Sequence, residues 1–325
     1  MNHQLLYGKE ERSIALPEHI KVTSVVKHPM PVLPDSSASI SEALLHPVQS
    51  PTLPELAGNR KTACILICDI TRPVPNGLIL PPLVNTLVES GIRKENILIL
   101  VATGLHRPNE GDELRELVGS DEIYNSIRIE NHFARDRDAH VDLGFTSTNI
   151  PIGIDRRFID ADLRIATGLV EPHFMAGYSG GRKVVAPGIA YQDTILKFHT
   201  AHVLEHENSD NCILDGNPLH QAQLEIIRTI GEIYSVNTVI DHRRRLGKVT
   251  FGEIEASHLE AVEFMKQYAE IEIDRKFRTI VTSAGGYPLD KTYYQTVKGM
   301  VGPLNILEEG GTLIIASECS EGMGS

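Results

Sequence analysis

The chain of 325 residues lacks several features that would place it in a special class of protein. It has no run of about 18 apolar residues, which a membrane-spanning helix needs. Its four cysteines are too few and too scattered for a disulfide framework. The N-terminal residues turn polar and acidic too early for a signal peptide. We therefore expect a cytoplasmic protein, either an enzyme or a small-molecule binder, that contacts no membrane.

An excess of positive charge is also lacking. The chain has 43 Asp and Glu against 31 Lys and Arg, so its formal net charge is −12. A negative protein repels phosphate backbones and anionic lipid surfaces. Nucleic acid is therefore not expected as a partner.

Continuous apolar runs of strand length alternate with segments of helical pattern. Buried strands are predicted at 62–68, 96–102, 126–131 and 162–168, with helices at 81–90 and 113–119. Such alternation indicates an α/β fold in which a mostly parallel sheet is flanked by helices. We predict a large N-terminal α/β domain over 1–270 and the beginning of a C-terminal α/β domain over 271–325.

Further elements follow from local patterns. Residues 28–60 are rich in Pro and Ser, with one brief helical pattern at 40–47, and predict an extended arm with little core. Downstream we predict helices at 191–198, 217–231 and 257–270, and a strand pair at 234–240 and 248–254. Ser257 is the predicted N-cap of the helix at 257–270.

Polar or glycine-rich turns follow the predicted strands directly. They lie at 69–73, 103–108, 169–173 and 287–290. In open parallel sheets, ligands bind outside the carboxyl ends of the strands. Each turn by itself is equally explained as a helix cap, because Asp and Thr cap helices and Pro begins them. Four together predict a binding site.

His106 and His173 each follow one of these strands. A histidine can give or take a proton near neutral pH, and two on opposite sides of a substrate suit a reaction that treats both faces alike. The alternative is a pair of ordinary surface or core histidines. Their positions beside Gly or Pro at strand ends favour the functional interpretation.

The segment Gly177–Lys183 is a glycine-rich loop that ends in two cations, Arg182 and Lys183. Glycines allow amide groups to approach an anion, so a phosphate or carboxylate is expected nearby. The spacing matches neither a P-loop nor a dinucleotide-binding fingerprint.

Metal-binding patterns are weak in this sequence. The spacing of His199, His202 and His206 predicts one helical face. A solvated helix face is favoured for His202 and His206. Cys64 and Cys68 lie in a predicted buried strand and are expected to act as small apolar residues.

Taken together, these motifs resemble the nickel-dependent lactate racemase family of 2-hydroxyacid racemases. The matching segments are DITRP (69–73), ATGLHRP (102–108), EPHFMAGYSGGRK (171–183), PGIA (187–190) with FHT (198–200), DGNPLH (215–220) and SAGGYPLDKTYYQTVK (283–298). The similarity runs in order from the N-terminal YGK to the last residues. Family members continue past the final ECSEGMGS, so the chain is expected to be C-terminally shortened.

The resemblance implies a cofactor that composition cannot reveal. It is a nickel pincer nucleotide attached covalently at Lys183, with His199 as a nickel ligand and His106 and His173 as the catalytic histidines. Arg72, Gln295 and Lys298 correspond to residues that hold substrate or cofactor. The remaining expected cofactor-binding residues are Asp69, Tyr294, Ser179, Gly180 and Gly181, the last three through their amides.

The implied reaction interconverts the enantiomers of a small, lactate-like 2-hydroxy acid by reversible hydride transfer. Abstracting the α-proton instead would form a carbanion beside a carboxylate, and no side chain accepts hydride, so a cofactor is required. Two alternatives stay open: a cofactor-free isomerase or lyase that uses the two histidines, and an inactive relative that binds an anion. Cofactor-biosynthesis enzymes and a second copy in a homodimer are expected partners.

Overall fold

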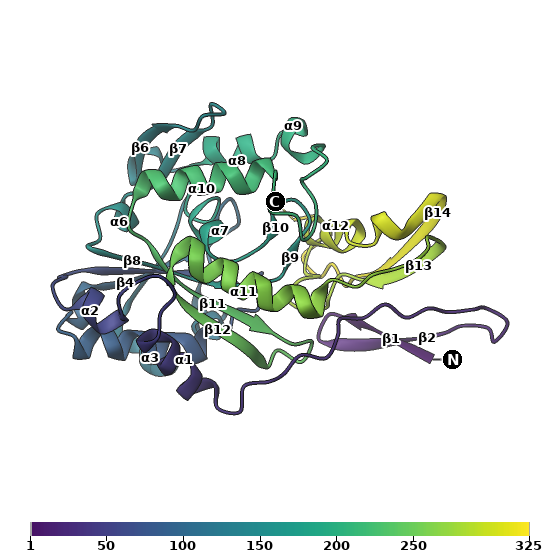
Figure 1. Ribbon diagram of the computed structural model, residues 1–325, viewed down its shortest axis with the longest axis horizontal. Helices are drawn as coiled ribbons and strands as arrows, with labels where there is room; N and C mark the ends of the chain where they lie inside the picture. Colours follow the sequence, from purple (N-terminus) through teal and green to yellow (C-terminus); the bar gives the residue numbers. More distant parts are fainter. Residues whose placement is uncertain (1, 325) are drawn as a thin grey trace. The chain divides into compact units, whose positions relative to one another are not determined.

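The computed structural model describes residues 2–324 (Figure 1). Contacts between Cα atoms divide the chain into two compact units. Residues 29–268 form the larger unit, and residues up to 28 group with those from 269 onward in the smaller unit. The predicted division into an N-terminal domain over 1–270 and the beginning of a C-terminal domain over 271–325 stays a prediction.

The larger unit contains a six-stranded sheet in the order β12-β11-β8-β3-β4-β5. Its strands are β3 (Ala63–Cys68), β4 (Ile97–Ala102), β5 (Arg128–Asn131), β8 (Leu163–Leu169), β11 (Tyr234–Ile240) and β12 (Leu246–Glu253). All neighbours are parallel except β11 and β12, which are antiparallel. The predicted α/β fold and the predicted strand pair are therefore confirmed.

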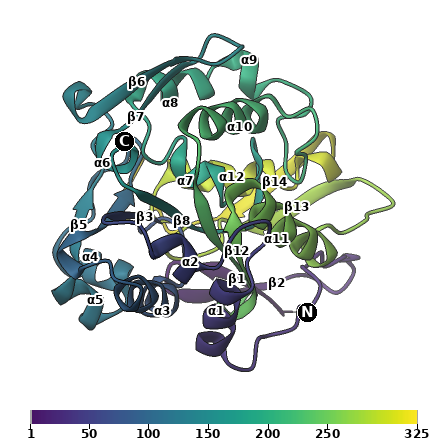
Figure 2. The same cartoon turned by 60° about the vertical axis from the view of Figure 1, so that its left-hand side comes forward.

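Helices cover both faces of this sheet (Figures 1 and 2). The helices are α1 (Ser36–Leu45), α2 (Leu53–Ala57), α3 (Asn76–Glu89), α4 (Gly111–Val118), α5 (Asp121–Ser126), α6 (Arg156–Ile159), α7 (Arg182–Val185), α8 (Gln192–Phe198), α9 (Ala201–Leu204), α10 (Pro218–Ile230) and α11 (Ile254–Ala269). Shorter elements are β6 (His140–Phe145), β7 (Pro151–Asp155), β9 (Pro172–His173), β10 (Gly177–Tyr178), η1 (Lys94–Asn96) and η2 (Arg137–Ala139).

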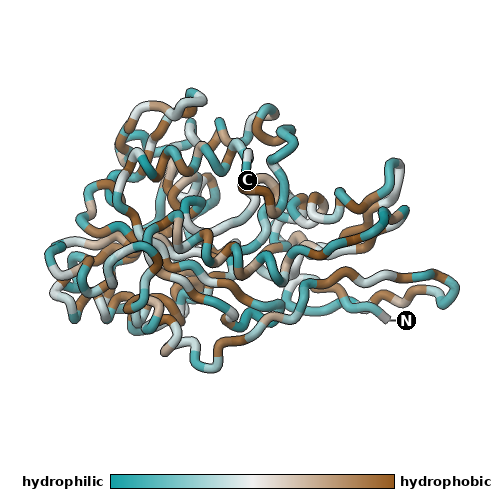
Figure 3. Tube along the Cα trace, in the orientation of Figure 1, coloured by the Kyte–Doolittle hydropathy of each residue, from teal (hydrophilic) through white to brown (hydrophobic). Residues whose placement is uncertain are grey.

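Two hydrophobic clusters fill the space between sheet and helices. Ile65 and Ile67 of β3 belong to the cluster under α1–α5, whereas Cys64 and Leu66 belong to the cluster under α7, α8 and α10. Successive side chains of a strand point to opposite faces, so one apolar run supplies both cores. Figure 3 shows the complementary pattern in the helices, where hydrophobic and hydrophilic positions alternate.

The N-terminal arm contributes more to the core than the sequence predicted. Ile40, Leu44 and Leu53, on α1 and α2, are buried in the first cluster. A capping box starts α2, because Thr52 and Glu55 hydrogen-bond each other's backbone amides. The prediction of an arm with little core was therefore wrong: the helical pattern at 40–47 overlaps α1, but the Pro-rich composition concealed α2 and the burial of both helices.

Two predicted helix starts were also wrong. α3 begins at Asn76 and contains Pro81 and Pro82 in its interior. α11 begins at Ile254, so Ser257 is not an N-cap, and its hydroxyl donates to the Glu253 carbonyl at 2.8 Å. The Glu253 carboxylate accepts from two amides of the first turn of α11 and takes the capping role.

The smaller unit contains a hairpin and a parallel strand pair. Its elements are β1 (Asn2–Tyr7), β2 (Glu10–Ala15), β13 (Phe277–Ser283), α12 (Tyr293–Val301), η3 (Leu304–Ile306) and β14 (Leu307–Ala316). The buried Asp290 carboxylate joins the two ends of the sequence, because it accepts from the amides of Gly8 at 2.7 Å and Glu318 at 3.2 Å. Within residues 2–324, every helix falls short of the length and hydrophobicity of a membrane span.

Candidate active site

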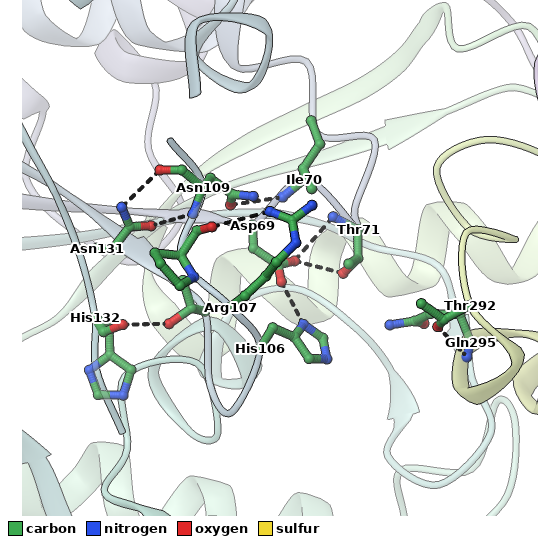
Figure 4. A network of polar contacts seen from close by, with 12 residues as sticks. Asp69, Ile70, Thr71, His106, Arg107, Asn109, Asn131, His132, Thr292 and Gln295 are labelled. Atoms are coloured by element: carbon green, nitrogen blue, oxygen red, sulfur yellow. Dashed lines mark hydrogen bonds and ion pairs between the residues drawn. The ribbon is translucent and has the colours of Figure 1, made fainter. Parts of the chain in front are cut away.

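A histidine–carboxylate pair lies at the carboxyl ends of β3 and β4 (Figure 4). Asp69 follows β3 and is 5% exposed. One of its oxygens, Oδ2, is 2.6 Å from Nδ1 of His106, which follows β4. The other, Oδ1, accepts from the hydroxyl of Thr71 at 2.6 Å and from its amide at 3.2 Å. Sequence reasoning missed Thr71, although its position two residues after an aspartate is typical of an Asx turn.

These contacts keep Asp69 ionised. Burial alone would raise the pKa of its carboxyl group, but hydrogen bonds from His106 and Thr71 and the nearby charge of Arg72 hold the pKa below its usual value. A carboxylate at Nδ1 orients the imidazole and favours a proton on that nitrogen. The pair is therefore suited to acid–base chemistry at the other ring nitrogen, Nε2.

Arg72 forms an ion pair that the sequence did not predict. Its Nη1 atom is 2.9 Å from Oε1 of Glu171, which follows β8. Both side chains are mostly covered, at 17% and 21% exposure. Glu171 therefore fixes the guanidinium at the edge where β3 and β8 end. The sequence showed Glu171 only as part of a motif, so its pairing with Arg72 could not be read from spacing.

His173 lies on β9 and is 5% exposed. Its Nδ1 atom accepts from the amides of Met175 and Ala176, each at 3.3 Å. The ring also stacks on Phe174, with 4.9 Å between ring centroids. The β9–β10 turn thus holds this histidine through backbone donors, whereas His106 is held by a carboxylate.

Lys183 lies on the short helix α7, directly after the glycine-rich loop. Burial, the largest cause, and the positive charges of Arg72 and Arg182 together lower the pKa of its amine to about 7. Cys68 and Asp69 interact with it electrostatically, which places Lys183 near the end of β3. A lysine of this kind is a substantially neutral nucleophile at neutral pH.

The glycine-rich loop is held closely by the protein itself. The amide of Ser179 donates to the Glu171 carbonyl, and that of Gly181 donates to the side chain of Asn237, both at 2.9 Å. A Cβ atom on Gly180 (φ +82°) would lie 2.7 Å from Val170 Cγ2. These glycines are thus required by close packing, and the role of the Ser179–Gly181 amides in phosphate binding stays a prediction. Asn237 could have been found as a polar residue inside an apolar strand.

His199 is the C-cap of α8, and its Nδ1 atom is 2.8 Å from the carbonyl oxygen of Ile195. The chain then turns before α9, so His199, His202 and His206 do not share one continuous helix, and that prediction was wrong. Among residues 2–324, no three His, Cys, Asp or Glu side chains converge to hold a metal ion.

The predicted site residues of the smaller unit lie on one helix, α12. Thr292 caps it and accepts from the amide of Gln295 at 3.2 Å (Figure 4). The Gln295 side-chain oxygen accepts from Nζ of Lys298 at 2.5 Å, and this ammonium lies 5.5 Å from the ring centroid of Tyr294. The structure therefore groups Tyr294, Gln295 and Lys298 with one another.

The larger unit thus combines an α/β sheet with acid–base, cationic and nucleophilic side chains near the carboxyl ends of its parallel strands. This arrangement defines an α/β enzyme.

Comparison with known proteins identifies the family. A family model described as the lactate racemase N-terminal domain matches residues 7–211, and one described as the lactate racemase C-terminal domain matches residues 274–325. The chain belongs to the lactate racemase family, and it is an isomerase of the racemase type. The resemblance seen in the sequence is confirmed.

Individual relatives agree with this placement. The lactate racemase of Thermoanaerobacterium thermosaccharolyticum is 31% identical over 99% of this chain and 76% of its own length. That of Lactiplantibacillus plantarum is 34% identical over 88% of this chain and 67% of its own length.

Solved structures show the same relationship. The T. thermosaccharolyticum lactate racemase apoprotein matches with a TM-score of 0.89 and 31% identity, over 100% of this chain and 76% of that chain. A protein from Thermotoga maritima matches with a TM-score of 0.64 and 24% identity, over 79% of this chain and 65% of its own, which shows a shared fold only.

Proposed function

We propose that this chain racemises a small 2-hydroxy acid, with lactate as the first candidate. The relatives named lactate racemase support the substrate class. The observation that supports the chemistry best is the short contact between Asp69 and His106, 2.6 Å, near the half-buried Lys183. We further propose that hydride moves reversibly to a nickel pincer nucleotide attached at Lys183.

Lys183 fits a covalent attachment of this kind. A thioamide nitrogen is uncharged, and the amine that forms it must first lose its proton. Because the pKa of Lys183 is lowered to about 7, the neutral amine is available near neutral pH. Acylation also removes a charge that burial disfavours. The environment of Lys183 thus supports both the formation and the persistence of the bond.

His199 fits the role of nickel ligand. With Nδ1–H donating to the Ile195 carbonyl, the lone pair of a neutral ring lies on Nε2. One histidine combined with donors from the cofactor would need no cluster of protein ligands. When bound, the cofactor supplies the hydride acceptor that side chains lack.

The remaining chemistry belongs to the protein's own residues. Arg72 binds the substrate carboxylate, and its guanidinium can do so through two parallel hydrogen bonds. His106 takes the hydroxyl proton through Nε2, while its Nδ1–H group continues to donate a hydrogen bond to the Asp69 carboxylate. His173 is proposed to serve the enantiomer with the opposite configuration.

Production together with the cofactor-biosynthesis enzymes, which we propose as partners, tests this function. We expect nickel in the purified protein, an added mass on the peptide containing Lys183, and conversion of each pure enantiomer of lactate to an equal mixture. Lys183→Arg should abolish both the added mass and the conversion. Absence of nickel and of the adduct from wild-type protein produced in this way would refute the cofactor proposal.

A cofactor-free histidine isomerase is the second candidate, favoured by the His106–Asp69 pair, which needs no cofactor to form. It would be active without nickel and unaffected by Lys183→Ala. An inactive anion-binding relative would be stabilised by 2-hydroxy acids without converting them. A cytoplasmic location and a homodimer stay predictions, which cell fractionation and sedimentation would test.

A further inference from the structure

The two proposed catalytic histidines differ in what their Nδ1 atoms contact. Nδ1 of His106 is 2.6 Å from Asp69 Oδ2, an acceptor only. Nδ1 of His173 is 3.3 Å from each of the amide nitrogens of Met175 and Ala176, which are donors only. Each partner therefore dictates whether Nδ1 carries a proton.

For His106 the partner requires a proton on Nδ1. An ionised carboxylate has no proton to donate, and the contacts from Thr71 and His106 together with the Arg72 charge keep Asp69 ionised. In the neutral ring the lone pair then lies on Nε2. His106 is 33% exposed, so Nε2 belongs to a ring that a ligand can approach.

For His173 the partners require a lone pair on Nδ1. A proton there would face two backbone N–H groups, and both hydrogen bonds would be lost at a site that is only 5% exposed. In the neutral ring the proton then lies on Nε2. The β9–β10 pairing of His173 with Gly177 holds the turn that supplies these amides.

We propose that the protein holds His106 and His173 in opposite neutral tautomers, so that Nε2 of His106 can accept a proton whereas Nε2 of His173 carries one and donates a hydrogen bond. This inference deepens the proposed racemase function and rests on it for its kinetic consequence. Asp69 acts in it as the positioning residue of His106.

The consequence is an asymmetry between the two enantiomers. When the hydroxyl group faces His106, Nε2 can take its proton directly; the cofactor, when bound, would supply the acceptor for the C2 hydride, so that the O–H and C–H bonds would break and a C=O bond would form. The resulting imidazolium of His106 still donates a hydrogen bond from Nδ1–H to the Asp69 carboxylate. When the hydroxyl group faces His173, Nε2 is already protonated, and the ring must first move its proton to Nδ1 and lose both amide hydrogen bonds.

Nitrogen NMR on the cofactor-free protein tests the tautomers without any turnover. Histidines are labelled with ¹⁵N, spectra are followed through a pH series to the range where the rings are neutral, and His106→Gln and His173→Gln assign the signals. We expect protonated Nδ1 for His106 and protonated Nε2 for His173. The same tautomer in both rings, or protonated Nδ1 in His173, would overturn the proposal.

Asp69→Asn is the matched perturbation. The amide of Asn can donate to Nδ1, which moves the His106 proton to Nε2 and leaves His173 unchanged. His132 is an internal reference for correct folding, because its Nδ1 and Nε2 lie 3.1 Å from Asp155 and from the Ala190 carbonyl. If His106 keeps Nδ1–H in Asp69→Asn while the His132 signals are unchanged, the assigned role of Asp69 is wrong.

Steady-state kinetics of the holoenzyme provide the second readout. A racemase has an equilibrium constant of one, so kcat/KM must be equal for both enantiomers. The tautomer change in His173 therefore appears as a difference in kcat between the enantiomers that is matched by an equal difference in KM. We expect a factor of up to about tenfold, the cost of losing the two weak amide hydrogen bonds of His173. Equal kcat and KM values for the two enantiomers would contradict this consequence. Failure of racemisation itself would refute the proposed function and leave the NMR result standing.

Discussion

The lowered pKa of Lys183 can be tested by removing one of its causes. Burial is the largest cause, and the charge of Arg72 is the next. Arg72→Gln deletes that charge and keeps a hydrogen-bond donor for Glu171. Because the Glu171 carboxylate would then lack its cationic partner, its negative charge would also favour the ammonium form of Lys183. A unit charge several ångströms away, at an effective dielectric constant of about 20, contributes on the order of 1–2 kcal/mol. The pKa of Lys183 should therefore rise by about one unit.

The change is measured as amine reactivity in the cofactor-free protein. Competitive acetylation across a pH series, read out by peptide mass spectrometry, gives the midpoint for Lys183 relative to the exposed Lys197 on α8. A rise from about 7 to about 8 lowers the neutral fraction at pH 7 about fivefold, so acetylation should slow by that factor. Arg93→Gln is the charge-matched control, because Arg93 precedes η1 and the amino end of β4, at the opposite edge of the sheet.

Two results would refute this reasoning. A midpoint for wild-type Lys183 above pH 9 would show that burial and positive neighbours do not act on it as argued. Equal shifts in Arg72→Gln and Arg93→Gln would show that the local charge at the end of β3 is not the cause.

Three further predictions concern stability and activity. Lys183→Met should stabilise the protein below about pH 7, with a gain that fades towards pH 10. The pKa of Lys183 is lower in the folded than in the unfolded protein, so the ammonium form destabilises the folded state until it loses its proton as pH rises. Urea denaturation at several pH values measures this gain. Asp69→Asn should lower kcat about 10²–10⁴-fold in a chiral assay of the holoenzyme. It should also remove a stability contribution that wild type has above about pH 4, the unfolded pKa, and loses as pH falls through the lower folded pKa. Gly180→Ala should cost about 1–3 kcal/mol in thermal unfolding, because its Cβ atom would lie 2.7 Å from Val170 Cγ2 at a φ of +82°; unchanged stability would contradict the packing role.

The sequence predicted the sheet because its strands are buried on both faces. A run such as TACILIC has no polar position, and such runs are typical of central parallel strands. For the same reason the polar turn after each run could be assigned to one edge, which located Asp69 and His106 correctly beside each other. The order of the strands could not be read, because hydrophobicity does not encode which strand pairs with which.

Other features depend on contacts between distant residues. Glu171 pairs with Arg72 across 99 positions, and Asn237 accepts from Gly181 across 56. Local patterns also misled where a tertiary contact or a neighbouring side chain took over a role. Ser257 looks like an N-cap, yet Glu253 caps α11 and Ser257 bonds inside the core. Spacing alone could not reveal that the Nδ1 atoms of the two histidines face opposite partners.

Hydride transfer and proton abstraction leave different isotopic records at C2 of the substrate, so racemisation in deuterium oxide tests the central proposal most directly. Holoenzyme is incubated with one pure enantiomer of lactate, and the product enantiomer is separated and analysed by mass spectrometry and proton NMR. The account predicts an equal mixture of enantiomers in which C2 keeps its original hydrogen, because hydride leaves and returns without exchanging with solvent. Deuterium at C2 of the product enantiomer would contradict it and favour proton abstraction by the histidines.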